Sequence, residues 1–145
     1  MNLSNAWKSY RQTATRTAPP GQLVLMLYDG AIRFSERALE GFQQDDPATS
    51  NMTINNNLQR AQEIIQELNW SLNMDEGGEV AVVLRQLYEY LDRRLHESNV
   101  KKEQEGIRES IRRLAVLRDA WSTMLRKQDA AQAEERFGAP VLAAA

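Results

Sequence analysis

The chain has 145 residues, of which 42% are hydrophobic, so it is long enough for one domain that buries about two-thirds of the surface its unfolded form exposes. Lysine and arginine number 18 against 20 aspartates and glutamates, and this balance excludes a strong long-range attraction to nucleic acid or anionic lipid. Cysteine is absent, which excludes disulfides and thiolate metal sites and fits the reducing cytoplasm.

Turn-forming residues divide the chain into segments of helical length. They cluster at residues 18–21, 44–47, 75–78 and 99–102. No alternating pattern typical of strands competes with the helical spacing, and the connections are short enough to favour antiparallel neighbours. The sequence therefore predicts an all-α fold, an antiparallel up-and-down four-helix bundle over residues 18–127.

The N-terminal residues 1–17 precede this bundle. Leu3, Trp7 and Tyr10 form a short apolar stripe, which predicts a helical or extended cap. The same residues hold no apolar core of signal-peptide length, and the longest apolar run, residues 23–27, is far too short to span a bilayer. We therefore expect a cytoplasmic protein without membrane insertion.

The first long segment, residues 22–42, carries two apolar stripes instead of one. The first comprises Leu23, Met26, Leu27, Ala31, Phe34 and Ala38, and the second comprises Leu25, Tyr28, Ile32 and Leu39. At about 100° per residue the second stripe lies nearly opposite the first. Because a bundle buries one stripe per helix, the second stripe needs a cover, either the N-terminal cap or a partner. Permanent core and partner groove both stay open at this point.

Each of the remaining segments carries a single apolar stripe at helical spacing. The stripes are Ile54, Leu58, Ala61, Ile65, Leu68 and Leu72, then Val80, Leu84, Leu87, Leu91 and Leu95, then Ile107, Ile111, Leu114, Leu117, Trp121 and Leu125. After Lys127 the chain becomes rich in Ala, Gln and Glu, which predicts a flexible C-terminal tail over residues 128–145.

Residue types that support catalysis are sparse. His96 is the only histidine and no Glu-x-x-His pair exists, so we expect no metal and no cofactor. No Gly-rich phosphate loop occurs, because Gly77 and Gly78 lack a following Lys-Ser or Lys-Thr. A phosphotransfer role for His96 remains an alternative, although no lysine follows it closely. A regulator that binds DNA through the Arg-rich last segment is a third possibility, but interspersed glutamates favour an ion-paired surface and no nucleic-acid partner.

Several short motifs then resemble one family. They are MLYDGAI at residues 26–32, AQEII at 61–65, GGEVA at 77–81, LYEY at 87–90 and LRDAW at 117–121. Together, in this order and over residues 10–121, they resemble the flagellar secretion chaperones of the FliS family. The chain departs from the family pattern at Pro19, where a serine is common, at Val83, where an asparagine is common, and at His96, where an aliphatic residue is usual.

The resemblance implies a cytoplasmic export chaperone without enzymatic activity. It implies that the bundle binds the disordered C-terminal segment of flagellin, prevents premature polymerisation and supports delivery to the flagellar type III export apparatus. Flagellin and export gate components are the implied partners, and we expect a monomer or weak dimer. The partner-binding residues we expect are Tyr10, Leu25, Tyr28, Ile32, Ile64, Tyr90 and Arg94. The N-terminal stripe is expected to cover the groove in the free protein and to leave it on binding.

Overall fold

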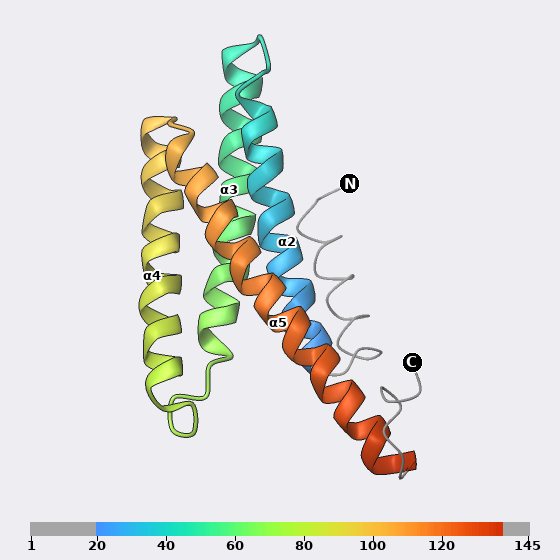
Figure 1. Cartoon of the computed structure of the whole chain (residues 1–145). Helices are drawn as coiled ribbons and strands as arrows, with labels where there is room; N and C mark the ends of the chain where they lie inside the picture. Colours follow the sequence, from blue (N-terminus) through green and yellow to red (C-terminus); the bar gives the residue numbers. More distant parts are fainter. Residues whose placement is uncertain (1–19, 138–145) are drawn as a thin grey trace.

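The computed structural model describes residues 20–137, and this part of the chain consists of four helices without a strand. They are α2 (Pro20–Gly41), α3 (Pro47–Trp70), α4 (Gly78–Lys101) and α5 (Glu105–Phe137). Helix α2 packs on α3 and α5, and α4 packs on the same two helices from the other side. Short turns make consecutive helices antiparallel (Figure 1). The predicted all-α, up-and-down four-helix bundle is confirmed.

The helices begin and end where the sequence supplies the required chemistry. Asp46 caps α3 by accepting a hydrogen bond from the backbone N–H of Thr49 at 3.0 Å, and Pro47 follows in the first turn. Helix α4 ends at Lys101, and the cap residue Lys102 is left-handed with φ of 53° and donates its N–H to the Ser98 carbonyl. The turn-forming clusters predicted from the sequence therefore coincide with the breaks between helices.

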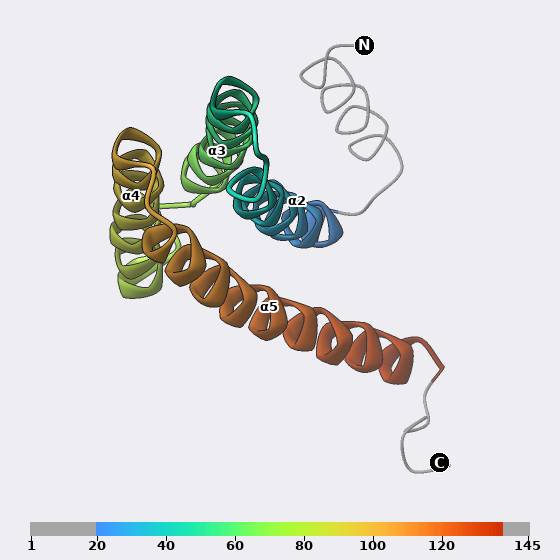
Figure 2. The same ribbon diagram turned by 90° about the horizontal axis from the view of Figure 1, so that it is seen from above.

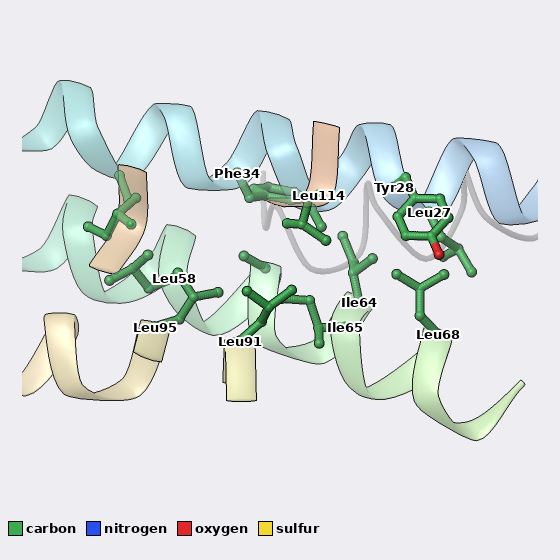
Figure 3. Packing of buried hydrophobic residues seen from close by; sticks show 14 of the residues in the cluster. Leu27, Tyr28, Phe34, Leu58, Ile64, Ile65, Leu68, Leu91, Leu95 and Leu114 are labelled. Carbon is green, nitrogen blue, oxygen red and sulfur yellow. The ribbon is translucent and has the colours of Figure 1, made fainter. Parts of the chain in front are cut away.

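The core runs along the centre of the bundle and contains most of the predicted stripes (Figure 3). Its buried members are Leu27, Tyr28, Ala31, Phe34, Ala38, Ile54, Leu58, Ala61, Ile64, Ile65, Leu68, Tyr88, Leu91, Leu95, Ile107 and Leu114. These side chains come from all four helices, so each helix depends on the others for its apolar cover.

One end of the bundle is tightly closed. We call the end with the α2–α3 and α4–α5 turns the closed end. At this end a side chain on Gly106 would collide with the Ser98 hydroxyl and the Arg94 carbonyl, so the glycine lets α5 begin directly against α4. Leu95 and Ile107 are fully buried beside it.

The opposite end, where the α3–α4 turn lies, is splayed, and we call it the open end. Helix α5 starts beside the C-terminal end of α4, then runs obliquely across α2 and away from the N-terminal half of α4 (Figures 1 and 2). The stripes continue but their burial falls: Leu84 and Leu87 on α4, and Leu117 and Trp121 on α5, are only half-buried.

Helix α5 is longer than the sequence predicted. The predicted tail begins at residue 128, whereas α5 continues to Phe137. Ala, Gln, Glu, Lys and Arg all have high helix propensity, and no breaker occurs before Gly138. Polar composition had suggested a tail, but it fits an exposed helix equally well. The predicted N-terminal cap over residues 1–17 and the rest of the tail lie outside the described residues.

Candidate functional site

The second stripe of α2 faces α5 inside the bundle. The Trp121 indole N–H donates to the Gly21 carbonyl at 2.8 Å, and Arg118 forms an ion pair with Asp29. Leu25 lies one turn after Gly21 and Ile32 nearly one turn after Asp29, so both half-buried side chains sit on this α5-facing side. The expectation that the stripe lacks a cover within the bundle is therefore wrong, because α5 covers it in part.

Tyr28, which we assigned to that second stripe, belongs to the core. It is 3% exposed, and its hydroxyl is hydrogen-bonded to that of Tyr88, which is 2% exposed. Tyr28 lies between the two stripes of α2, and it turns inward with Ala31 three residues later. Burial raises the pKa of both phenols above the ordinary value, so both stay protonated at neutral pH.

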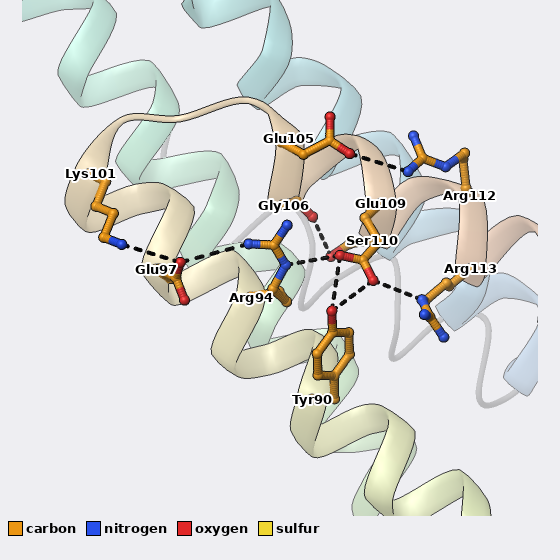
Figure 4. A network of polar contacts seen from close by, with 10 residues as sticks. All are labelled: Tyr90, Arg94, Glu97, Lys101, Glu105, Gly106, Glu109, Ser110, Arg112 and Arg113. Atoms are coloured by element: carbon orange, nitrogen blue, oxygen red, sulfur yellow. Dashed lines mark hydrogen bonds and ion pairs between the residues drawn. The ribbon is translucent and has the colours of Figure 1, made fainter.

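The other expected partner-binding residues are scattered over the bundle. Ile64 is buried in the core on α3, and Tyr10 lies outside the described residues. Tyr90 and Arg94 lie one turn apart on α4 and both contact Glu109 of α5 (Figure 4). The structure thus brings Tyr90 and Arg94 together but leaves them apart from Ile64.

Glu109 is the centre of a polar cluster that joins α4 to α5 (Figure 4). Its carboxylate accepts hydrogen bonds from the Tyr90 hydroxyl at 2.8 Å, from Arg94 Nε at 2.9 Å and from Arg113 Nε at 3.0 Å. The hydrogen bonds from Tyr90 and Arg94 lower the pKa of Glu109, and the Arg113 guanidinium lies over the Tyr90 ring. This cluster stabilises the α4–α5 contact next to the point where the two helices diverge.

Beyond this cluster the bundle contains an apolar hollow of about 290 Å³ at the open end. All four helices contribute to it, since Val24 and Tyr28 come from α2, Leu68 from α3, Leu84 from α4 and Trp121 from α5. The remaining lining residues are Ser71, Leu72, Asn73, Gly77, Val80, Ala81 and Tyr88. Its lining is predominantly apolar, as expected of a site that takes apolar side chains.

A second hollow of about 320 Å³ lies along the α4–α5 boundary. It is lined by Leu87, Arg112, Arg113, Val116 and Leu117. Leu84 of the first hollow and Leu87 of the second are neighbours on α4, and Trp121 and Leu117 are neighbours on α5, so both hollows lie along the same two helices. We call the apolar surface that these four side chains line the α4–α5 groove.

Exposed valines flank the α4–α5 groove. Val80 on α4 and Val116 on α5 line the hollows, and each is 68% exposed. The sequence did not predict this groove, because the stripes of both helices have the spacing of core residues. The available signal was an apolar residue outside a stripe, Val116, which a closed bundle would leave in water.

Few side chains among the described residues are placed for catalysis or metal binding. Between residues 20 and 137 no group of three or more His, Asp or Glu side chains is placed to hold a metal. His96 is exposed on α4. None of the helices described is long and apolar enough to cross a membrane.

A helical bundle with an apolar groove is one of the arrangements by which proteins receive an amphipathic helix of a partner. Comparison with known proteins identifies the family. Residues 3–128 match the family model described as flagellar protein FliS. The chain belongs to this family of flagellar secretion chaperones, which confirms the resemblance.

The similar relatives are all of comparable length. The flagellar secretion chaperone FliS of Bacillus subtilis is 34% identical over 88% of this chain and 92% of its own length. The chaperone of the same name from Salmonella typhimurium is 32% identical over 83% of this chain and 90% of its own. The one from Campylobacter jejuni is 29% identical over 91% of this chain and all of its own.

Proposed function

We propose that this protein is a cytoplasmic export chaperone that binds the disordered C-terminal segment of flagellin. Binding keeps flagellin from polymerising early and supports its delivery to components of the flagellar export gate. Membership of the family supports the chaperone role, and the α4–α5 groove is the single observation that supports this mode of binding.

The groove has the properties that an amphipathic segment needs. Leu84, Leu87, Leu117 and Trp121 are half-buried, so a docked helix gains apolar contacts without a rearrangement of the core. A disordered segment that folds on docking loses conformational entropy, which moderates the affinity and makes release possible without nucleotide hydrolysis.

The residues expected from the sequence have different places in this proposal. Tyr90 and Arg94 border the groove on α4 and contact flagellin along its polar edge. Leu25 and Ile32 support the groove indirectly by holding α5 against α2. The N-terminal stripe, including Tyr10, covers apolar surface in free protein and leaves on binding, so deleting the residues before Thr17 should speed flagellin association.

Three valines with equal exposure make a matched test. Val80, Val100 and Val116 are each 68% exposed, but only Val80 and Val116 line the groove. Glutamine at each position removes apolar surface without adding charge and keeps a good helix former. We expect Val80→Gln and Val116→Gln to weaken binding of the flagellin C-terminal segment by roughly tenfold each, since burial of a valine side chain contributes about 1.5 kcal/mol.

The Val100→Gln variant is the control and should bind as the wild type does. Binding is measured by calorimetric titration with the purified segment, and circular dichroism checks the fold. Equal affinities of all three variants would place the contact elsewhere, and failure of the wild type to bind the segment would reject the flagellin proposal itself.

A further inference from the structure

Tyr28 and Tyr88 meet at the floor of the hollow at the open end. Both line the hollow, and their hydroxyls are hydrogen-bonded to each other. Their ring centroids are 6.5 Å apart, and the Tyr28 hydroxyl points from α2 toward Leu68 of α3 (Figure 3). The only polar atoms of these two otherwise apolar side chains are therefore in contact with each other, and both residues line the hollow.

The two hydroxyls carry one more O–H donor than their mutual hydrogen bond uses. Each phenol carries one O–H donor, and a single proton occupies the line between the two oxygens. Because burial raises the pKa of both groups, both protons are present. Within residues 20–137 the pair makes no hydrogen bond other than the mutual one, so one O–H donor has no acceptor there.

Two other polar side chains that line the hollow, Ser71 and Asn73, already form hydrogen bonds. The Ser71 hydroxyl donates to the Leu68 carbonyl at 2.7 Å, and Asn73 contacts Glu76 through both ends of its amide. When a partner fills the hollow and excludes water, an O–H group left without an acceptor destabilises the complex, so the hollow favours an occupant that supplies an acceptor.

We propose that the Tyr28–Tyr88 hydroxyl pair anchors a side-chain amide, from Asn or Gln, of the helical segment that docks in the α4–α5 groove. The inference rests on the proposed function and adds the chemistry of one contact. The amide oxygen accepts the unused O–H, and the amide nitrogen donates to a lone pair of the phenol oxygens. A carboxylate is disfavoured because the lining of the hollow includes no cation to offset its desolvation.

The proposed hydrogen bond also fixes the position of the docked helix along the groove. Apolar contacts along Leu84, Leu87 and Leu117 tolerate a helix that slides by one turn, whereas a buried hydrogen bond is satisfied in one position only. A partner whose amide is misplaced leaves the O–H unpaired, so the pair discriminates among amphipathic segments of similar hydrophobicity.

The test is the double variant Tyr28→Phe with Tyr88→Phe. Replacing both partners of a buried hydrogen bond by groups of the same shape is nearly neutral for folding, so circular dichroism and the unfolding midpoint should change little. Binding of the flagellin C-terminal segment from the same bacterium should weaken about tenfold, the effect of one buried hydrogen bond. Each single Phe variant keeps one O–H donor and should bind within about threefold of the wild type.

Substitutions in the flagellin segment complete a double-mutant cycle with the tyrosine variants. Each Asn of the segment is replaced by Leu and each Gln by Met. One of these substitutions should weaken binding to the wild type about tenfold and leave binding to the double Phe variant unchanged.

The outcomes separate the two proposals. If the double Phe variant binds the unmodified segment as tightly as the wild type, or if no amide of the segment couples to the tyrosines, the anchor is rejected while flagellin binding stands. If the wild-type protein does not bind the segment, the proposed function fails first, and the anchor on flagellin fails with it.

Discussion

The closed and open ends of this bundle are built from the same two apolar stripes but have different properties. At the closed end Leu91 and Leu95 of α4 are fully buried, and Gly106 brings α5 into contact with α4. At the open end the next residues of the same stripe, Leu87 and Leu84, are half-buried along a groove. The difference shows that an apolar stripe determines which side of a helix faces inward, whereas the crossing of α4 and α5 determines whether that side is covered.

The largest predicted effect is the difference in stability loss between a substitution at the closed end and one at the open end. Leu91→Ala removes a side chain that is 0% exposed and should lower the free energy of unfolding by about 2–5 kcal/mol. Leu87→Ala, one turn earlier on the same helix, should lower it by less than about half as much, because its side chain already contacts water. Urea unfolding monitored by circular dichroism gives both values, and equal losses would show that the open end is as tightly packed as the closed end.

The second prediction concerns the contact that closes the bundle. Gly106→Ala places a methyl group against the Ser98 hydroxyl and the Arg94 carbonyl, so it should destabilise the protein by about 1–3 kcal/mol. Adding Ser98→Ala removes the nearer of these atoms and should recover part of the loss. Thermal unfolding measures both variants, and a stable Gly106→Ala protein would mean that α5 does not need this close approach.

A smaller, pH-dependent effect should come from Glu109. Its folded pKa lies below the ordinary value because Tyr90 and Arg94 donate hydrogen bonds to the carboxylate. Its contribution is therefore present above the unfolded pKa of about 4.3 and is lost as the pH falls through the lower folded pKa.

The matched comparison is the Glu109→Gln variant, which cannot titrate at this position. Between about pH 5 and about pH 3 the wild type should lose more stability than the variant. Parallel stability curves for the two proteins would show that the Glu109 cluster does not stabilise the closed end.

The regular part of the fold was predictable from the sequence. Stripes at helical spacing placed Leu58, Leu95 and Leu114 in the core, and turn-forming clusters located the breaks between helices. The inward position of Tyr28 was not predicted, because an aromatic residue between two stripes fits either side of a helix until its neighbours are known. Its partner Tyr88 is 60 residues away and lies outside the predicted stripe of its own segment.

The groove was harder to predict for a related reason. Its walls are core stripes in the sequence, and their exposure depends on the oblique path of α5, which periodicity does not encode. The partner class was accessible only through motifs such as residues 26–32, whose resemblance to one family carries information that composition and spacing lack.

The central claim is that the α4–α5 groove at the open end receives the flagellin segment, and a footprint tests it most directly. The chain has no cysteine, so Val80→Cys, Val116→Cys and Val100→Cys each introduce one thiol, at positions that share 68% exposure. The rate of thiol alkylation is measured with and without a saturating amount of the flagellin C-terminal segment. We expect the segment to slow labelling at positions 80 and 116 at least tenfold, on the order of the burial energy of one such side chain, and to leave position 100 unchanged. Unchanged rates at positions 80 and 116 while the segment is bound would contradict the account.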